Sequence, residues 1–306
     1  MAEIMKTIWL LVITVALGLA FYLPKEIGRW WTEFNNPETI TIYKPIGDSP
    51  DLSAVVGFTA EADEPVDAKA VVERLLDGLP GDYGVWVDQG LAIKADKVYT
   101  AASVIKLPVL IAYYQAVDAG SLDPEAIYTL VEADRWQYGT GSMQNQPEGT
   151  KYTYGEIAKL VANQSDNMGA EVLIKKLGGY SGVQRTVNSW GLTDTNVKEN
   201  ETTPEEMGDL FLSLQQGKLL TPDSRGELFT NLTNTINEDR LPAGVPSGVT
   251  VVHKFGSEDG VVSDCGTVMA KKPYVVCVLS TGINAGEAEV ALPKISRVIW
   301  EWLGDK

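Results

Sequence analysis

Histidine and cysteine are nearly absent from this chain of 306 residues, which holds one histidine, His253, and two cysteines, Cys265 and Cys277. A single histidine excludes the HExxH pattern and sites built from several histidines, and two cysteines exclude a four-cysteine metal site and a disulfide scaffold. We expect neither a metal nor a cofactor. A Ser-His-Asp triad could use only His253, so any serine chemistry is expected to use lysine as its base.

Cys265 and Cys277 fall in β-rich runs. If strands run through both, the two side chains could face each other across a hairpin, and a disulfide between them remains open. Two inert buried thiols are the favoured interpretation of the pair.

Positive charge is also scarce. The 25 lysines and arginines are outnumbered by 41 aspartates and glutamates, which gives a formal net charge of −16 at pH 7. Such a charge opposes binding to phosphate backbones and to anionic membrane surfaces, so we expect no nucleic-acid partner. A chain of this length can bury a full core and form one large domain or two small ones.

One long uncharged run lies near the N-terminus. Residues 7–23 carry no charge, and Lys6 precedes them. The run is at the short limit for a membrane-spanning helix and at the long limit for the core of a signal peptide. We favour an uncleaved membrane anchor in residues 1–23 that holds the rest of the chain outside the cytoplasm. Cleavage at a small-x-small site near Ala20 would instead release a secreted protein.

The remainder divides at about residue 64. Residues 24–64 mix proline, glycine, tryptophan and acidic residues without sustained periodicity, which predicts a spacer, and residues 65–306 form the predicted folded domain. Periodicity and turn residues predict helices at 66–79, within 99–120, and at 154–163, 167–177, 203–216, 222–233 and 287–303, a hairpin at 82–93, and strands at 249–253, 261–270 and 274–281. This order predicts an α+β fold: an antiparallel sheet formed by N- and C-terminal strands, flanked by helices, with an all-helical lobe.

Residues 99–120 predict a polar helix start followed by an almost wholly apolar helix. Ser103 and Lys106 lie three positions apart at that start, so on a helix they share one face and lie within reach of each other. A lysine beside such an apolar run is partly removed from water, which lowers its pKa and favours the neutral amine that accepts a proton. The spacing indicates a nucleophile and its base, although Ser-x-x-Lys also occurs by chance and decides nothing alone.

Two further polar groups stand in structured surroundings. Ser165, Asp166 and Asn167 lie at the junction of two predicted helices, and the segment KFGS, residues 254–257, stands at the end of a predicted strand. Acyl transfer needs an activated nucleophile, a proton route to the leaving nitrogen, positive charge for the substrate carboxylate and amides aimed at the oxyanion. The three groups contain residue types suited to those tasks.

The three groups resemble the S-x-x-K, S-D-N and K-[ST]-G motifs of the serine penicillin-recognising enzymes, and within them the class A β-lactamase-like family. The likeness covers about Val66 to Trp302 and includes the segments AASVIKLPVL, YGTGS, TTP and DCGTV. It implies an extracytoplasmic serine hydrolase that forms an acyl-enzyme with β-lactams or related cell-wall peptides and hydrolyses the β-lactam amide.

The resemblance also implies which residues perform the reaction. Ser103 would be the nucleophile and Lys106 a base for acylation, while Ser165 would pass a proton toward the leaving nitrogen. Lys254 would supply positive charge for Ser165 and for the substrate carboxylate. Asp166 is expected to be structural and to tie its loop by hydrogen bonds.

Substrate binding is implied for a second set of residues. Asn167 would hold the substrate amide, and the backbone amides of Ser103 and Ser257 would form the oxyanion hole. Phe255 replaces the hydroxyl residue of the third motif, so the usual hydrogen bond to the substrate carboxylate is missing unless Ser257 or Thr140 supplies it.

The loop before TTP departs further from the family. Class A enzymes place a long loop there, with an E-x-x-L-N element whose glutamate activates water for deacylation, whereas residues 191–201 read GLTDTNVKENE. Glu199 or Glu201 could substitute for that glutamate, but the favoured interpretation is that both are solvated loop charges. A positioned general base contributes about 10² to 10⁴ in rate, so acylation is better supported than efficient deacylation.

Three functions therefore remain open. The leading hypothesis is a membrane-anchored serine hydrolase of the class A β-lactamase-like family. A D,D-peptidase or transpeptidase acting on D-Ala-D-Ala stem peptides is the second, because the deacylation element is missing. The third is a slow-deacylating penicillin-binding sensor that keeps the fold without turnover.

Overall fold

The computed structural model describes residues 67–135, 139–283 and 285–304. The predicted anchor in residues 1–23 and the predicted spacer in residues 24–64 lie outside these ranges. Within the described ranges, no helix combines the length and the apolar character that a bilayer crossing requires.

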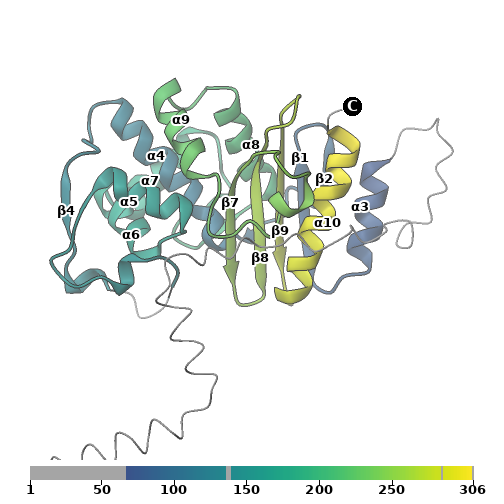
Figure 1. The fold of residues 1–306 in the computed structure, drawn as a ribbon, viewed down its shortest axis with the longest axis horizontal. Coiled ribbons are helices and arrows are strands. Elements are labelled where there is room, and N and C mark those ends of the chain that lie inside the picture. The colour runs from purple at the N-terminus through teal and green to yellow at the C-terminus, as the bar shows by residue number, and fades with distance from the viewer. Residues whose placement is uncertain (1–66, 136–138, 284, 305–306) are drawn as a thin grey trace, which may run out of the picture. The chain divides into compact units, whose positions relative to one another are not determined.

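A five-stranded antiparallel sheet organises the described chain, with the strand order β2-β1-β9-β8-β7 (Figure 1). Its strands are β1 (Asp82–Val87), β2 (Leu91–Ile93), β7 (Val251–Glu258), β8 (Val261–Val268) and β9 (Tyr274–Thr281). The early hairpin joins the late strands through the pairing of β1 with β9. The predicted α+β architecture, with a sheet shared between the two ends of the domain, is confirmed.

Apolar residues cover both faces of the sheet. On one face, α3 (Ala68–Asp77) and α10 (Ala285–Leu303) pack over one cluster of buried side chains, and Figure 1 shows these two helices side by side. On the other face lies α8 (Pro204–Gln215), whose Met207 and Phe211 belong to a second cluster. Because successive strand residues point to opposite faces, Val276 and Cys277 belong to different clusters.

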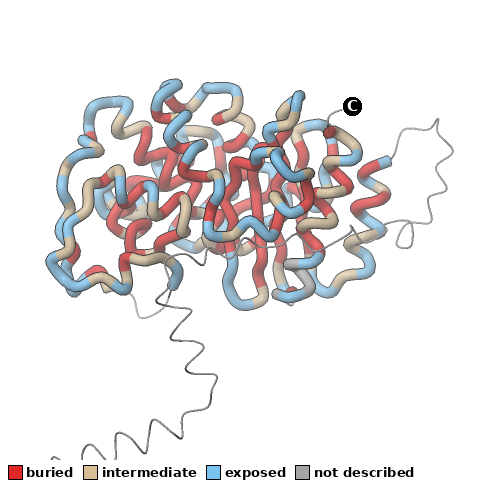
Figure 2. Tube along the Cα trace, viewed as in Figure 1, coloured by how far each residue is buried: buried red, intermediate tan, exposed pale blue. Residues whose placement is uncertain are grey.

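The helical lobe surrounds α4 (Lys106–Asp118), which is buried from Lys106 to Tyr114 (Figure 2). The helices packed around α4 are α5 (Tyr154–Asn163), α6 (Asn167–Lys176), α7 (Gly179–Ser189) and α9 (Pro222–Asn231). An α-helix without a polar stripe must be covered on all sides, which explains the central position of α4 and confirms the expected burial.

Small elements complete the chain between the main helices and strands. They are β3 (Tyr99–Thr100) paired with β6 (Glu201–Thr202), β4 (Ile127–Thr129) paired with β5 (Lys151–Thr153), and the 3-10 turns η2 (Ala102–Ile105), η3 (Glu132–Asp134), η4 (Met143–Asn145) and η5 (Pro242–Gly244). Ser103 therefore stands on a 3-10 turn directly before α4, rather than on the α-helix itself.

Three sequence expectations need correction. The strand predicted at 249–253 runs from Val251 to Glu258, because Ser257 and Glu258 continue the pairing with β8, so the segment KFGS lies inside the strand. The helix α7 was not predicted, since the glycines at its start and its polar residues hide its periodicity. The final helix begins two residues before the predicted residue 287.

The two cysteines are also paired, contrary to the favoured interpretation. Cys265 and Cys277 face each other directly on β8 and β9, and a disulfide joins them. Both residues are fully buried. Thiols placed opposite each other on neighbouring strands lie close enough to bond, which residue spacing alone does not establish.

Candidate active site

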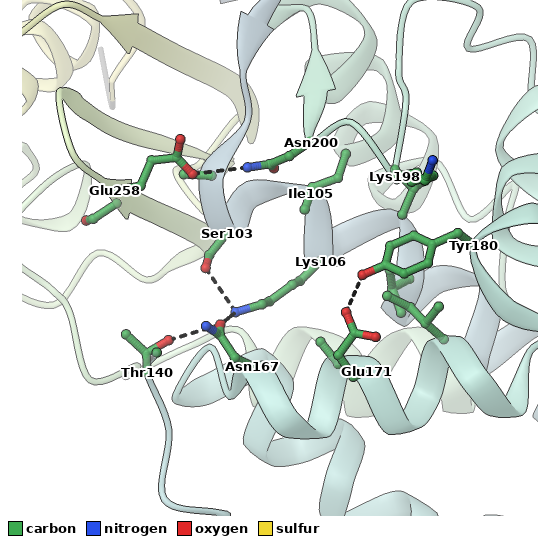
Figure 3. Close-up of a pocket in the computed structure, with 17 residues that line it drawn as sticks. Ser103, Ile105, Lys106, Thr140, Asn167, Glu171, Tyr180, Lys198, Asn200 and Glu258 are labelled. Atoms are coloured by element: carbon green, nitrogen blue, oxygen red, sulfur yellow. Dashed lines mark hydrogen bonds between the residues drawn. The ribbon is translucent and has the colours of Figure 1, made fainter. Parts of the chain in front are cut away.

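A cavity of about 490 Å³ opens where the helical lobe meets the strand β7. Its walls are formed by η2, the start of α4, one face of α6, the start of α7 and the end of β7, together with the loop before β6 (Figure 3). Five of the sequence-predicted site residues line it: Ser103, Lys106, Thr140, Asn167 and Ser257. Ser165 and Lys254 lie directly behind them, fully buried, and contact Lys106 or each other.

Lys106 is the centre of the hydrogen-bond network. Its Nζ donates to Ser103 Oγ over 2.9 Å and to the carbonyl oxygen of Ser165 over 2.5 Å. The same atom lies 3.2 Å from Ser165 Oγ and 2.5 Å from Asn167 Oδ1. Two segments far apart in sequence thus converge on one ammonium group, as the first two motifs predict.

Burial lowers the pKa of Lys106 from its ordinary value to about 7, while the Asp166 and Glu171 carboxylates oppose part of that change. The neutral amine is therefore a substantial species near neutral pH. A neutral amine 2.9 Å from Ser103 Oγ can accept the hydroxyl proton, which is the condition for an activated serine.

Ser165 links the two lysines. Its hydroxyl oxygen accepts from Lys254 Nζ over 2.9 Å, and its carbonyl oxygen accepts from the hydroxyl of Thr140 over 2.7 Å. Ser165 has a positive φ of 57°, a conformation that non-glycine residues seldom adopt and that often marks a functional site. Thr140 thus holds the Ser165 backbone, so its hydroxyl proton is already engaged.

Asp166 holds this loop in place. Its carboxylate accepts from the backbone amides of Gly169 and Met143, each over 2.9 Å, and caps the start of α6. The expectation that Asp166 is structural is confirmed.

Lys254 projects from β7 into the same network. Complete burial lowers its pKa, the positive charges of Lys106 and Arg240 act in the same direction, and Asp264 opposes them. Its Nζ also lies 4.2 Å from the centre of the Phe255 ring. An anion bound beside Lys254 would favour its protonated form again, because opposite charges stabilise each other.

Arg240 is a site residue that the sequence analysis missed. It is almost fully buried beneath β7, where its guanidinium donates to the carbonyl oxygens of Gly256 and Ser263 and, over 2.5 Å, to Ser257 Oγ. The segment before η5 offers no motif around Arg240, so only the packing of that segment on β7 reveals the contact. Two buried basic side chains, Lys254 and Arg240, thus lie at the end of β7.

His253 belongs to a structural cluster behind the site and takes no part in a triad. Its Nδ1 lies 2.9 Å from Asp264 Oδ1, and its Nε2 lies 3.1 Å from Glu238 Oε1. Burial lowers the pKa of His253, but the two carboxylates outweigh that effect and raise it to about 9. The charged histidine joins β7, β8 and the loop before η5, which supports the position of Lys254.

The loop before β6 forms one wall of the cavity and places no carboxylate in that wall. Val197, Lys198 and Asn200 line the cavity, whereas Glu199 and Glu201 are exposed and are not among its described lining residues. Both glutamates are solvated, as expected. Among the described residues, the structure contains no cluster of three or more side chains suited to hold a metal ion.

The sequence also matches a known family. A family model described as "Beta-lactamase enzyme family" matches residues 67–303, which is most of the chain. This chain belongs to that family.

Individual relatives agree with the family assignment. The beta-lactamase VEB-1 of Pseudomonas aeruginosa is 27% identical over 244 residues, which cover 71% of this chain and 82% of the relative. The solved structure of PBP-A superposes with a TM-score of 0.73 at 29% identity, covering 78% of this chain and 97% of PBP-A. A PBP-A mutant solved as an acyl-enzyme complex with penicillin G is 28% identical, with a TM-score of 0.72 and the same coverage. The protein is thus a class A β-lactamase-like serine hydrolase.

Proposed function

We propose that this protein is an extracytoplasmic enzyme that β-lactams acylate at Ser103 and that then hydrolyses the acyl-enzyme. The contact of 2.9 Å between Lys106 Nζ and Ser103 Oγ carries the proposal, because Lys106 has a pKa of about 7. As Ser103 Oγ attacks the β-lactam carbonyl, the neutral Lys106 takes its proton. The penicillin G complex of the PBP-A mutant supports this substrate class.

The proton then needs a route to the leaving nitrogen. Ser165 Oγ lies 3.2 Å from Lys106 Nζ and 2.9 Å from Lys254 Nζ. Ser165 can donate its own proton to the β-lactam nitrogen and receive one from Lys106. This relay returns Lys106 to its neutral form while the ring amide breaks.

The end of β7 is the proposed binding site for the substrate carboxylate. Phe255 lacks the hydroxyl of the family motif, but the hydroxyl oxygen of Ser257 accepts from Arg240, which leaves its proton free to point at an anion. Arg240 supplies positive charge there, and a bound carboxylate would favour the protonated, charged form of Lys254 against the effect of its burial. The backbone amides of Ser103 and Ser257 remain the proposed oxyanion hole.

A D,D-peptidase or transpeptidase is the second candidate. The loop before β6 places Lys198 and Asn200 in the cavity wall, so it supplies no carboxylate there that could activate water for deacylation. This absence favours the second candidate. A peptidase that transfers its acyl group to an amine needs no water-activating base.

Labelling with a fluorescent penicillin tests the proposal. We expect the wild type to become labelled, Ser103→Ala to remain unlabelled, and Lys106→Ala to react at least about 10²-fold more slowly, as for loss of a general base. Equal labelling of wild type and Ser103→Ala, or no labelling of either, would overturn it.

Substrate turnover separates the candidates. Steady hydrolysis of nitrocefin would support the leading function, whereas turnover of a D-Ala-D-Ala peptide without nitrocefin hydrolysis would support the second. A permanent adduct without turnover of either substrate would indicate a penicillin-binding sensor.

A further inference from the structure

Two carboxylates lie among the described residues of the reaction cavity, Glu171 and Glu258. Glu258 is exposed at the end of β7, where it accepts from the side-chain amide of Asn200. Glu171 is half-buried on α6, four residues after Asn167. Residues four apart on a helix share one face, so Glu171 and Asn167 both point toward the cavity (Figure 3).

Tyr180 holds Glu171 in this position. The hydroxyl of Tyr180, at the start of α7, donates a hydrogen bond to Glu171 Oε1 (Figure 3). Burial and the neighbouring Glu171 raise the pKa of Tyr180, so the hydroxyl keeps its proton and remains a donor. Within the described ranges the structure contains no hydrogen bond to the other oxygen, Oε2. One carboxylate oxygen is therefore fixed while the second can accept a proton.

The charge of Glu171 acts on the catalytic residues. It raises the pKa of Lys106 against the effect of burial, together with Asp166. Asp166 is committed to two backbone amides, whereas Glu171 faces the cavity. Of the two carboxylates that influence Lys106, Glu171 is thus the one that solvent in the cavity can reach.

We propose that Glu171 is the general base of deacylation and that Tyr180 positions it. The inference rests on the proposed function, because it concerns the acyl group carried by Ser103. Water loses a proton to the Glu171 carboxylate as its oxygen bonds to the acyl carbonyl carbon. The bond from that carbon to Ser103 Oγ then breaks, and the proton returns to Oγ. A helix residue thereby performs the step for which the loop at 191–201 offers no side chain.

Intact-mass spectrometry of the full chain with penicillin G tests the assignment, since it follows acylation and decay of the adduct separately. In Glu171→Gln we expect deacylation to slow by about 10² to 10⁴, the range for a general base, with acylation changed by only a few-fold. Tyr180→Phe should slow deacylation about tenfold, because the carboxylate stays but loses its partner. Glu199→Gln, on the exposed loop, is the matched control and should behave as the wild type.

A second readout distinguishes a catalytic from a structural role. The negative charge of Glu171 raises the pKa of Lys106, so Glu171→Gln should lower that pKa and move the acid limb of the acylation profile to lower pH. A change in packing alone would not produce that shift together with a slowed decay. Retained acylation also shows that the variant is folded.

Several results would overturn the inference. The first is decay of the Glu171→Gln and Tyr180→Phe adducts at the wild-type rate. The second is slowed decay of the adduct in Glu258→Gln but not in Glu171→Gln. The third is a wild-type adduct that never decays. Absence of any adduct on wild-type Ser103 would overturn the proposed function itself, so the two failures are distinguishable.

Discussion

Lys106 has an unusual position for a lysine, since it begins a helix whose first turns are entirely buried. The sequence alone predicted a lowered pKa there from the apolar residues that follow. The structure adds the partners, Ser103, Ser165 and Asn167, which place four oxygen atoms around the amine. Desolvation therefore lowers the pKa of the Lys106 amine, while hydrogen bonds to the four oxygen atoms keep the amine in position.

The rate of acylation should depend on pH through this residue. Lys106 accepts a proton only when neutral, so below its pKa of about 7 the rate should fall about tenfold per pH unit, and above it the rate should level off. Stopped-flow acylation by penicillin G at constant ionic strength measures the profile. A rate that is flat through neutral pH would show that another group takes the proton from Ser103.

Arg240 and Glu171 are two site residues that the sequence analysis did not identify, for different reasons. Glu171 could have been found from the sequence, because it lies one helical turn after the S-D-N motif on the same predicted helix. Arg240 could not, since its contact with Ser257 depends on how a loop packs beneath β7.

At the scale of elements, the site depends on the close approach of β7 to η2. A Cβ added to Gly256 would lie 2.8 Å from the backbone nitrogen of Ser103 and 2.9 Å from that of Val104. Real Cβ atoms do not approach backbone so closely, so the third motif needs glycine at this position for contact with the nucleophile turn.

Gly256→Ala should therefore separate β7 from η2. We expect acylation to slow by at least about tenfold and the free energy of unfolding to fall by about 1 to 3 kcal/mol, as in overpacked cores. Penicillin labelling rates and urea unfolding measure the two effects. Gly226→Ala on α9 is the control, because no atom lies within 4 Å of its added Cβ and alanine favours helix. An unchanged rate of acylation in Gly256→Ala would show that acylation does not need the close approach of β7 to η2.

At the scale of the whole molecule, the net charge disfavours contact with a membrane, whereas the apolar N-terminal run favours it. A charge of −16 opposes adsorption to anionic membranes, so we expect any membrane association to come from the uncharged residues 7–23. We keep the proposal of an N-terminal anchor with the catalytic domain outside the cytoplasm, where β-lactams and cell-wall peptides are present.

Fractionation of cells that express the full chain tests this location. The protein should sediment with membranes, resist a salt wash, and be digested by protease added outside the cytoplasmic membrane. Val15→Asp should weaken the association, because an aspartate at the centre of a span costs about 2.5 to 3.5 kcal/mol. Leu52→Asp in the predicted spacer is the control and should sediment like the wild type. Wild-type protein in the soluble cytoplasmic fraction would contradict the proposal.

Ser103 and Lys106 illustrate what can be predicted about this protein from its sequence alone. Their spacing, the motifs at Ser165 and Lys254 and the order of the elements determined the family and the α+β sheet and predicted the nucleophile, because these depend on periodicity and on neighbours along the chain. Only the tertiary structure decided that Cys265 bonds to Cys277, that Arg240 supports Ser257, and that Glu171 faces the cavity while Glu199 and Glu201 face solvent. Those facts depend on strand register and on contacts between segments distant in the chain, which local residue preferences do not specify.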